Sequence, residues 1–154
     1  RDGEIMKNFD AQKFSERFSD EYALLIRLHP QVHTGEVDAG ESAIDMTGYP
    51  DVGELVRICD LLITDYSSIC MDFVLLKKPC LFYAFDLEEY ERERSFFFSY
   101  EDYVPGKTAK TFDGLLDMIA SEDFGKDRQE KFREFNFDVF DGKSAERTAD
   151  AIVK

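Results

Sequence analysis

Short apolar runs alternate with longer segments of mixed character along most of this chain. Four runs have the length and composition of strands: YALLIR (22–27), AIDMTG (43–48), DLLITD (60–65) and PCLFYAF (79–85). The longer segments predict helices over residues 51–59, 68–78, 111–121, 125–137 and 144–154. Strands that alternate with helices of this length form βαβ units. The pattern therefore predicts an α/β fold with a mainly parallel sheet that helices cover on both faces.

Two of the predicted helices carry signals at their ends. Asp51 is suited to cap the helix that follows it, and Glu54 stands three residues further on, at the spacing of a capping box. Lys77 and Lys78 close the helix predicted over 68–78, where positive charge suits the C-terminal end of the dipole. Both signals agree with the helix boundaries that the apolar pattern predicts.

Polar clusters follow three of the predicted strands. Arg27 and His29 come at the end of the first strand, residues 65–68 at the end of the third, and residues 86–89 directly after the fourth. In parallel sheets of this kind, ligands bind outside the carboxyl ends of the strands. We therefore expect the functional site at this edge of the sheet, where the three clusters converge.

The segment TDYSSICMDF (64–73) places two serines, Ser67 and Ser68, at the junction between a predicted strand and the predicted helix that follows it. Serines at such a junction commonly cap the helix. Neither is followed three residues later by Glu or Gln, so the first amides of the helix are left more open to an anion. Asp72 competes for the same positive potential. Local sequence favours capping, and phosphate binding is the alternative.

Arg27 and His29 are two residues apart, so in extended chain both side chains point to the same side. A guanidinium grips phosphate oxygens at two points, and a protonated imidazole offsets charge on a leaving phosphate. The alternative is an exposed arginine beside a loop histidine. A zinc site with His33 is not expected, because Pro30 breaks the helix that such a pair needs and no acidic third ligand is evident.

Nine of the chain's aromatic residues lie between positions 82 and 103, ahead of a Pro105-Gly106 turn. They form either a flap packed on the sheet, or a lid that stacks on a base or meets a partner domain. The same stretch carries three carboxylates that suit the start of a helix or the hydroxyls of a ribose, followed by two arginines that add positive charge: Asp86, Glu88, Glu89, Arg92 and Arg94.

Composition narrows the class of protein and its partners. The 154 residues are 44% hydrophobic, as expected of one globular domain. With 33 acidic and 19 basic residues the formal net charge is −14, which argues against nucleic acid and anionic membranes as partners. Cys59, Cys70 and Cys80 lie in or beside apolar runs, which predicts buried free thiols in a reducing cytoplasm. The chain begins at Arg1 rather than at a methionine, which predicts that it is part of a longer protein.

Several segments together carry a family resemblance: IRLHP (26–30), DVGELVRICDLLITDYSSICMDFVLLKKP (51–79), FYAFDLEEYERERSFFFSYEDYVPG (82–106), KTFDGLL (110–116) and DGKSAERTADAI (141–152). The combination resembles the C-terminal part of the CDP-glycerol glycerophosphotransferases, which polymerise teichoic acids and related cell-surface polymers. The resemblance implies a two-domain GT-B architecture whose Rossmann-like C-terminal domain binds the donor nucleotide. Residues 1–154 are then a single donor-nucleotide-binding domain that lacks the N-terminal acceptor domain and starts about where the family's first strand of this domain ends.

The resemblance also implies roles for individual residues. His29 matches the motif histidine that faces the donor phosphates and is the expected catalytic residue. Arg94 matches an arginine ahead of the aromatic segment, where Ser95 replaces the more usual glycine. The residues expected to bind phosphate are Ser67, Ser68, Arg27 and Arg94, and those expected to bind the nucleotide are Asp65, Asp86, Glu88 and Glu89.

The implied reaction is attack of an acceptor hydroxyl on the β-phosphorus of a CDP-polyol, here CDP-glycerol, with release of CMP. Glycerol phosphate would pass to a polyol-phosphate polymer or lipid-linked acceptor, without a metal or cofactor, at the cytoplasmic face of the membrane. The family's histidine base belongs to the N-terminal domain, so this chain alone is expected to bind the donor without turnover. Two alternatives stay open: a GT-B domain that uses a nucleotide sugar, and a non-catalytic nucleotide- or phosphate-binding module.

Overall fold

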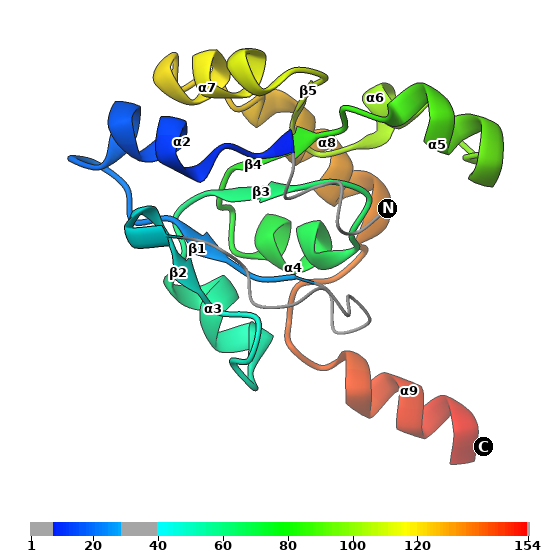
Figure 1. The fold of residues 1–154 in the computed structure, drawn as a ribbon. Coiled ribbons are helices and arrows are strands. Elements are labelled where there is room, and N and C mark those ends of the chain that lie inside the picture. The colour runs from blue at the N-terminus through cyan, green and yellow to red at the C-terminus, as the bar shows by residue number, and fades with distance from the viewer. Residues whose placement is uncertain (1–7, 29–39, 154) are drawn as a thin grey trace.

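The computed structural model describes residues 8–28 and 40–153 of the chain. Its strands are β1 (Leu25–Ile26), β2 (Ile44–Asp45), β3 (Leu62–Thr64), β4 (Cys80–Tyr83) and β5 (Lys107–Ala109). Its helices are α2 (Ala11–Phe18), α3 (Val52–Ile58), α4 (Ile69–Leu75), α5 (Leu87–Arg94), α6 (Tyr100–Tyr103), α7 (Phe112–Ala120), α8 (Lys126–Asn136) and α9 (Ser144–Val153), with a 3₁₀ turn η1 (Gly40–Ser42). Figure 1 shows α4 and α7 on opposite sides of the strands β3, β4 and β5.

The main sheet has the order β3-β4-β5, and both of its pairings are parallel. The chain passes from β3 to β4 through α4, and from β4 to β5 through α5 and α6. A second parallel pair joins β1 to β2, with Leu25 opposite Ile44. The predicted parallel α/β fold is therefore confirmed, although its strands are shorter than the apolar runs that signal them. The sequence reasoning missed β5, α2 and α6.

The central strand β4 is buried on both faces. Cys80 and Phe82 face the cluster that includes α4 residues such as Phe73, while Leu81 and Tyr83 face the cluster built by α2 and α7. This division follows from the alternation of side chains along a strand. All four residues of β4 are buried, as expected of a parallel strand covered on both sides. The apolar run that signals the strand is thus explained by its place in the middle of the sheet.

Of the two predicted helix-end contacts, the cap by Asp51 is observed and the role of Lys78 is different. Asp51 caps α3 as predicted, because its carboxylate accepts hydrogen bonds from the backbone amides of Gly53 and Glu54. The prediction for Lys78 is wrong, since α4 ends at Leu75. The Lys78 Nζ donates to the carbonyl oxygens of Arg57 and Cys59 and so serves the C-terminal end of α3 instead. The positive charge therefore serves the C-terminal end of a neighbouring helix rather than that of α4.

All three cysteines are free, as predicted. Cys70 and Cys80 are buried, and burial raises the pKa of their thiols to about 11 and about 12. Cys59 is only half-buried, and burial raises the pKa of its thiol as well. The thiols are therefore protonated at neutral pH and pack as small apolar side chains.

The Pro105-Gly106 turn brings the start of β5 very close to β4. A Cβ atom on Gly106 would lie 1.9 Å from the carbonyl oxygen of Cys80, a distance that no side chain tolerates without a shift of the backbone. Glycine at this position therefore lets β5 pair with the central strand, and the pairing places Lys107 opposite Leu81.

We expect Gly106→Ala to lower the free energy of unfolding by roughly 2–3 kcal/mol, because the added methyl group collides with backbone of a buried strand. The matched control is Gly48→Ala, since a Cβ at Gly48 meets no atom within 4 Å. Urea denaturation followed by far-UV circular dichroism measures both variants. Equal stability of the two variants would contradict the close approach.

Candidate functional site

Two of the three predicted clusters meet at the carboxyl ends of β3 and β4. These strands are neighbours and parallel, so the loop after β3 and the start of α5 lie at the same edge of the sheet (Figure 1). The contact is direct, because the Tyr66 hydroxyl donates to Oδ1 of Asp86 over 2.9 Å. The predicted convergence is confirmed for residues 65–68 and 86–89. Tyr66 itself was missed, although it stands between Asp65 and the serine pair in the sequence.

Ser67 and Ser68 are both exposed at the start of α4. The Ser67 hydroxyl accepts a hydrogen bond from the amide of Ile69 over 3.3 Å, so Ser67 contributes the cap that local sequence favours. Ser68 occupies the N-cap position, but within the described structure its side chain makes no capping hydrogen bond. α4 is shorter than predicted, so a bound anion would depend on the hydroxyls and nearby amides more than on a long helix dipole. Capping and phosphate binding are therefore compatible uses of the pair.

The carboxylates after β4 have different surroundings. Asp86 is half-buried at the N-cap position of α5, and its side chain turns to Tyr66. Glu88 and Glu89 are exposed in the first turn of α5, where negative charge suits the helix dipole. Asp65 is held through its backbone, because its carbonyl oxygen accepts from the Tyr100 hydroxyl over 2.7 Å. Burial raises the pKa of Tyr100 far above its usual range, so this hydroxyl stays a donor. Nucleotide binding by these residues stays a prediction.

The cluster after β1 is described only in part. Arg27 Nη1 donates to the carbonyl oxygens of Met46 and Tyr49, so the guanidinium fastens the loop that follows β2. His29, the expected catalytic residue, lies outside the described residues, as does His33. Phosphate binding by Arg27 and the role of His29 therefore stay predictions.

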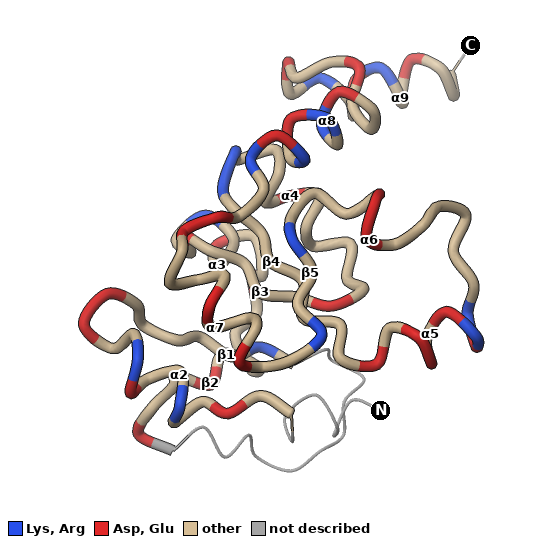
Figure 2. The backbone as a smooth tube through the Cα atoms, turned by 90° about the horizontal axis from the view of Figure 1, so that it is seen from above, with Lys and Arg blue, Asp and Glu red and all other residues tan. Residues whose placement is uncertain are grey.

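The aromatic residues between positions 82 and 103 were predicted to form either a packed flap or an exposed lid, and the structure shows both kinds of position. The ends of this segment pack into the core, with Phe82 1% and Tyr100 5% exposed. Between them Phe96, Phe97 and Phe98 are exposed, and Phe97 is as open to solvent as in an extended chain. The flap interpretation is thus correct for the ends. In the middle, Phe96 and Phe98 still contact neighbouring rings from one side, at 5.2 Å from Tyr100 and 5.1 Å from Tyr103 respectively, and it is Phe97 that the interpretation does not explain. Figure 2 shows acidic positions along α5 and basic ones at its C-terminal end, where Arg94 lies exposed.

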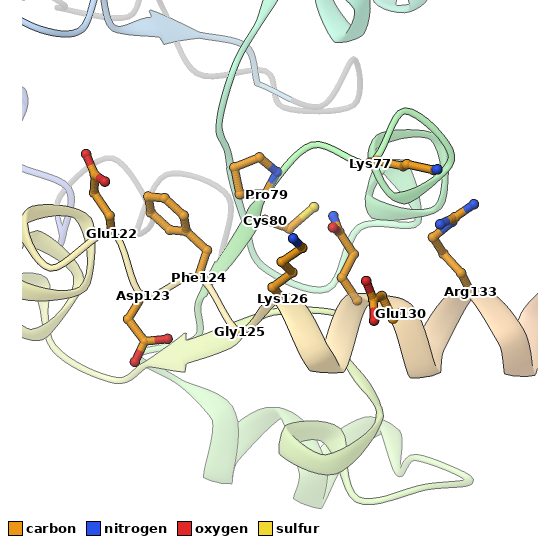
Figure 3. A pocket seen from close by; sticks show the side chains of 11 residues that line it. Lys77, Pro79, Cys80, Glu122, Asp123, Phe124, Gly125, Lys126, Glu130 and Arg133 are labelled. Carbon is orange, nitrogen blue, oxygen red and sulfur yellow. The ribbon is translucent and has the colours of Figure 1, made fainter.

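A separate pocket lies at the opposite edge of the sheet, beside the start of β4 and the start of α8 (Figure 3). Its volume is about 370 Å³, and its lining mixes cations with carboxylates such as Glu122 and Glu130. None of the predicted site residues that the structure describes lines it. Across residues 8–28 and 40–153, no three His, Cys, Asp or Glu side chains are grouped in a way that could hold a metal ion. The same residues contain no helix that is long and apolar enough to cross a membrane.

Comparison with known proteins decides the family. A family model described as CDP-glycerol:poly(glycerophosphate) glycerophosphotransferase matches residues 1–154. The chain belongs to this family. It is 35% identical over 147 residues to the teichoic acid poly(ribitol-phosphate) polymerase of Bacillus spizizenii, covering 94% of this chain and 24% of that protein. It is 32% identical over 152 residues to the teichoic acid glycerol-phosphate transferase of Staphylococcus aureus, covering 96% of this chain and 39% of the relative.

Solved structures of the wall teichoic acid polymerase TagF have the same fold. One of them superposes with a TM-score of 0.76 at 28% identity, covering 94% of this chain and 37% of the TagF chain. Another, from a crystal soaked with CDPG, gives a TM-score of 0.73 at 30% identity and covers 94% of this chain and 38% of TagF. These matches confirm the predicted family and the predicted fold class, the Rossmann-like part of a GT-B transferase. The chain spans a quarter to two fifths of the length of these proteins.

Ser95 joins α5 to the exposed aromatic residues in an unfavourable backbone conformation, with φ 57° and ψ 148°. Since glycine adopts this conformation readily, Ser95→Gly is expected to raise the free energy of unfolding by about 1 kcal/mol. Ser95→Ala keeps the Cβ atom and is expected to change it little. Urea denaturation compares the two variants, and a loss of stability in Ser95→Gly would show that the serine is not strained.

Proposed function

We propose that this chain binds a CDP-polyol donor and stabilises its pyrophosphate while polyol phosphate passes to a teichoic acid-type polymer and CMP is released. The observation that carries the proposal is the exposed pair Ser67 and Ser68, placed where the carboxyl ends of β3 and β4 meet in a chain of this family. Ligands of parallel sheets bind at this edge. The CDPG soak of TagF supports the donor class, since that protein shares the fold of this chain.

The residues would act on the charge that develops at the transferred phosphate. Hydroxyl and amide donors at Ser67 and Ser68 would hold the oxygens of the pyrophosphate, and Arg27, Arg94 and His29 would balance their negative charge. The acceptor hydroxyl attacks the β-phosphorus, the bond to the bridging oxygen breaks, and CMP leaves with the electron pair. The base that takes the acceptor's proton would come from outside this chain, and neither a metal nor a cofactor is needed for this role.

The relatives divide between two polyols. The relatives include enzymes named for ribitol phosphate and for glycerol phosphate, at similar identity to this chain. Glycerol phosphate is the specific donor group that we propose, and a polyol-phosphate polymer or lipid-linked molecule is the acceptor. The reaction would take place on the cytoplasmic side of the membrane, with attachment through parts of the protein other than this chain.

Replacing both serines, Ser67→Ala with Ser68→Ala, should weaken the binding of CDP-glycerol by about 10- to 100-fold, because hydrogen bonds to a charged group are lost. Ser121→Ala is the matched control, since this exposed serine donates to the carbonyl of Met118 at the end of α7. Isothermal titration calorimetry with CDP-glycerol, CMP and UDP-glucose measures the affinities. Unchanged binding in the double variant, or preference for UDP-glucose, would count against the proposed function.

The 154-residue chain alone should bind CDP-glycerol or CMP weakly and release no CMP in the presence of a glycerol-phosphate acceptor. The physical reason is that the general base must be held within hydrogen-bonding reach of the attacking hydroxyl, and this chain has no match to the family's base. Chromatographic measurement of released CMP tests this prediction, with the full-length protein that the gene encodes as the positive control. Turnover by the 154 residues would show that they hold a complete site.

A further inference from the structure

Tyr66 stands directly before the serine pair and is held by contacts with several residues. Its hydroxyl donates to Asp86 at the start of α5 over 2.9 Å. Its ring stacks on Tyr90 of α5, with centroids 3.8 Å apart and planes inclined by 1°. Its ring also packs against Tyr100 at 5.1 Å, and the Tyr100 hydroxyl holds the backbone carbonyl of the preceding Asp65. The residue before Ser67 is thus joined to α5 and α6 at once.

The other side of the serine pair is anchored as well. Immediately after Ser68, α4 buries Cys70, Phe73 and Val74 in the cluster beneath the sheet. Two exposed serines therefore lie between a half-buried attachment point at Tyr66 and a buried one in α4. Groups held in this way lose little freedom when they bind a ligand, which is the condition for hydrogen-bond donors to stabilise developing charge effectively.

We infer that Tyr66 is a positioning residue of the phosphate site, which sets the place of Ser67 and Ser68 through its hydrogen bond to Asp86 and its stack on Tyr90. The predicted effect of Tyr66 on transfer rests on the proposed function. The predicted effect of Tyr66 on the order of residues 65–70 does not. Tyr66 also joins the start of α5, which carries Asp86, Glu88 and Glu89, to the segment that carries Ser67 and Ser68. A nucleotide held by α5 and a pyrophosphate held by the serines would then be aligned by one side chain.

A purely structural role is the competing explanation, and removing the hydroxyl alone separates the two. Tyr66→Phe keeps the ring that packs on Tyr90 and Tyr100 but deletes the hydrogen bond to Asp86. The matched control is Tyr103→Phe, which deletes the half-buried hydrogen bond that the Tyr103 hydroxyl donates to Oδ1 of Asn136 on α8, and not one made by residues 65–68. Both variants remove one tyrosine hydroxyl from the same aromatic region.

In the full-length protein, Tyr66→Phe should lower kcat/KM for transfer from CDP-glycerol by about tenfold, through a higher KM as well as a lower kcat, because the serines that it positions are proposed to hold the donor both before and during transfer. In the Ser67→Ala, Ser68→Ala background the same change should have a clearly smaller effect, because the two hydroxyls that Tyr66 positions are absent there and only the backbone amides remain. Tyr103→Phe should leave kcat and KM unaltered. An equal loss from Tyr66→Phe in both backgrounds, or none in either, would overturn the inference.

Hydrogen exchange of the backbone amides gives a readout that does not depend on the substrate. Residues 65–70 should exchange several-fold faster in Tyr66→Phe than in the parent protein, whereas Tyr103→Phe should leave them unchanged. Unchanged exchange at 65–70 in Tyr66→Phe would overturn the inference whatever the activity. Faster exchange together with no binding of CDP-glycerol by the parent protein would instead support the positioning role and reject the proposed function.

Discussion

The burial of β4 on both faces is the constraint from which the rest of the structure follows. A parallel strand with buried side chains on both sides needs a helical layer above and below it and a neighbour on each edge. The chain meets this demand with α4 and α7 as layers and with β3 and β5 as neighbours. The same demand explains Gly106, because β5 approaches the central strand so closely that no side chain fits at that point.

The place of the site is a consequence of this arrangement. Since β3 and β4 are parallel neighbours, the segments that leave them emerge at one edge, and the short connection through α4 keeps the serine pair there. The buried Tyr100 of α6 reaches back to this edge and holds the carbonyl oxygen of Asp65, while Tyr66, in the loop itself, donates to Asp86 at the start of α5. Packing that stabilises the domain and packing that shapes the loop are therefore the same set of contacts.

The elements that were predictable from sequence are those with strong local signals. The runs that became β3 and β4 and the helices α3, α7 and α8 were found because their apolar pattern or caps are visible without tertiary information. β5 has the sequence Lys-Thr-Ala and forms only because β4 offers it a partner. α2 did carry a signal, since Asp10 caps it and Phe14 and Phe18 are spaced as on one helix face, and it was overlooked. The roles of Lys78 and Tyr66 depend on partners far away in sequence, which local patterns do not contain.

The acid excess of the chain bears on how the proposed donor would be held. With a formal net charge of −14, the long-range field of this chain disfavours the approach of a pyrophosphate, and salt reduces that effect. Affinity would then have to come from short-range contacts, which are less screened and depend steeply on geometry. In the described residues, Ser67 and Ser68 offer such contacts. Nη1 of Arg27 already donates hydrogen bonds to two backbone carbonyls. A site that works mainly through a few hydrogen bonds gains most from being held rigidly, and the aromatic contacts around Tyr66 would provide that rigidity in the site that we infer.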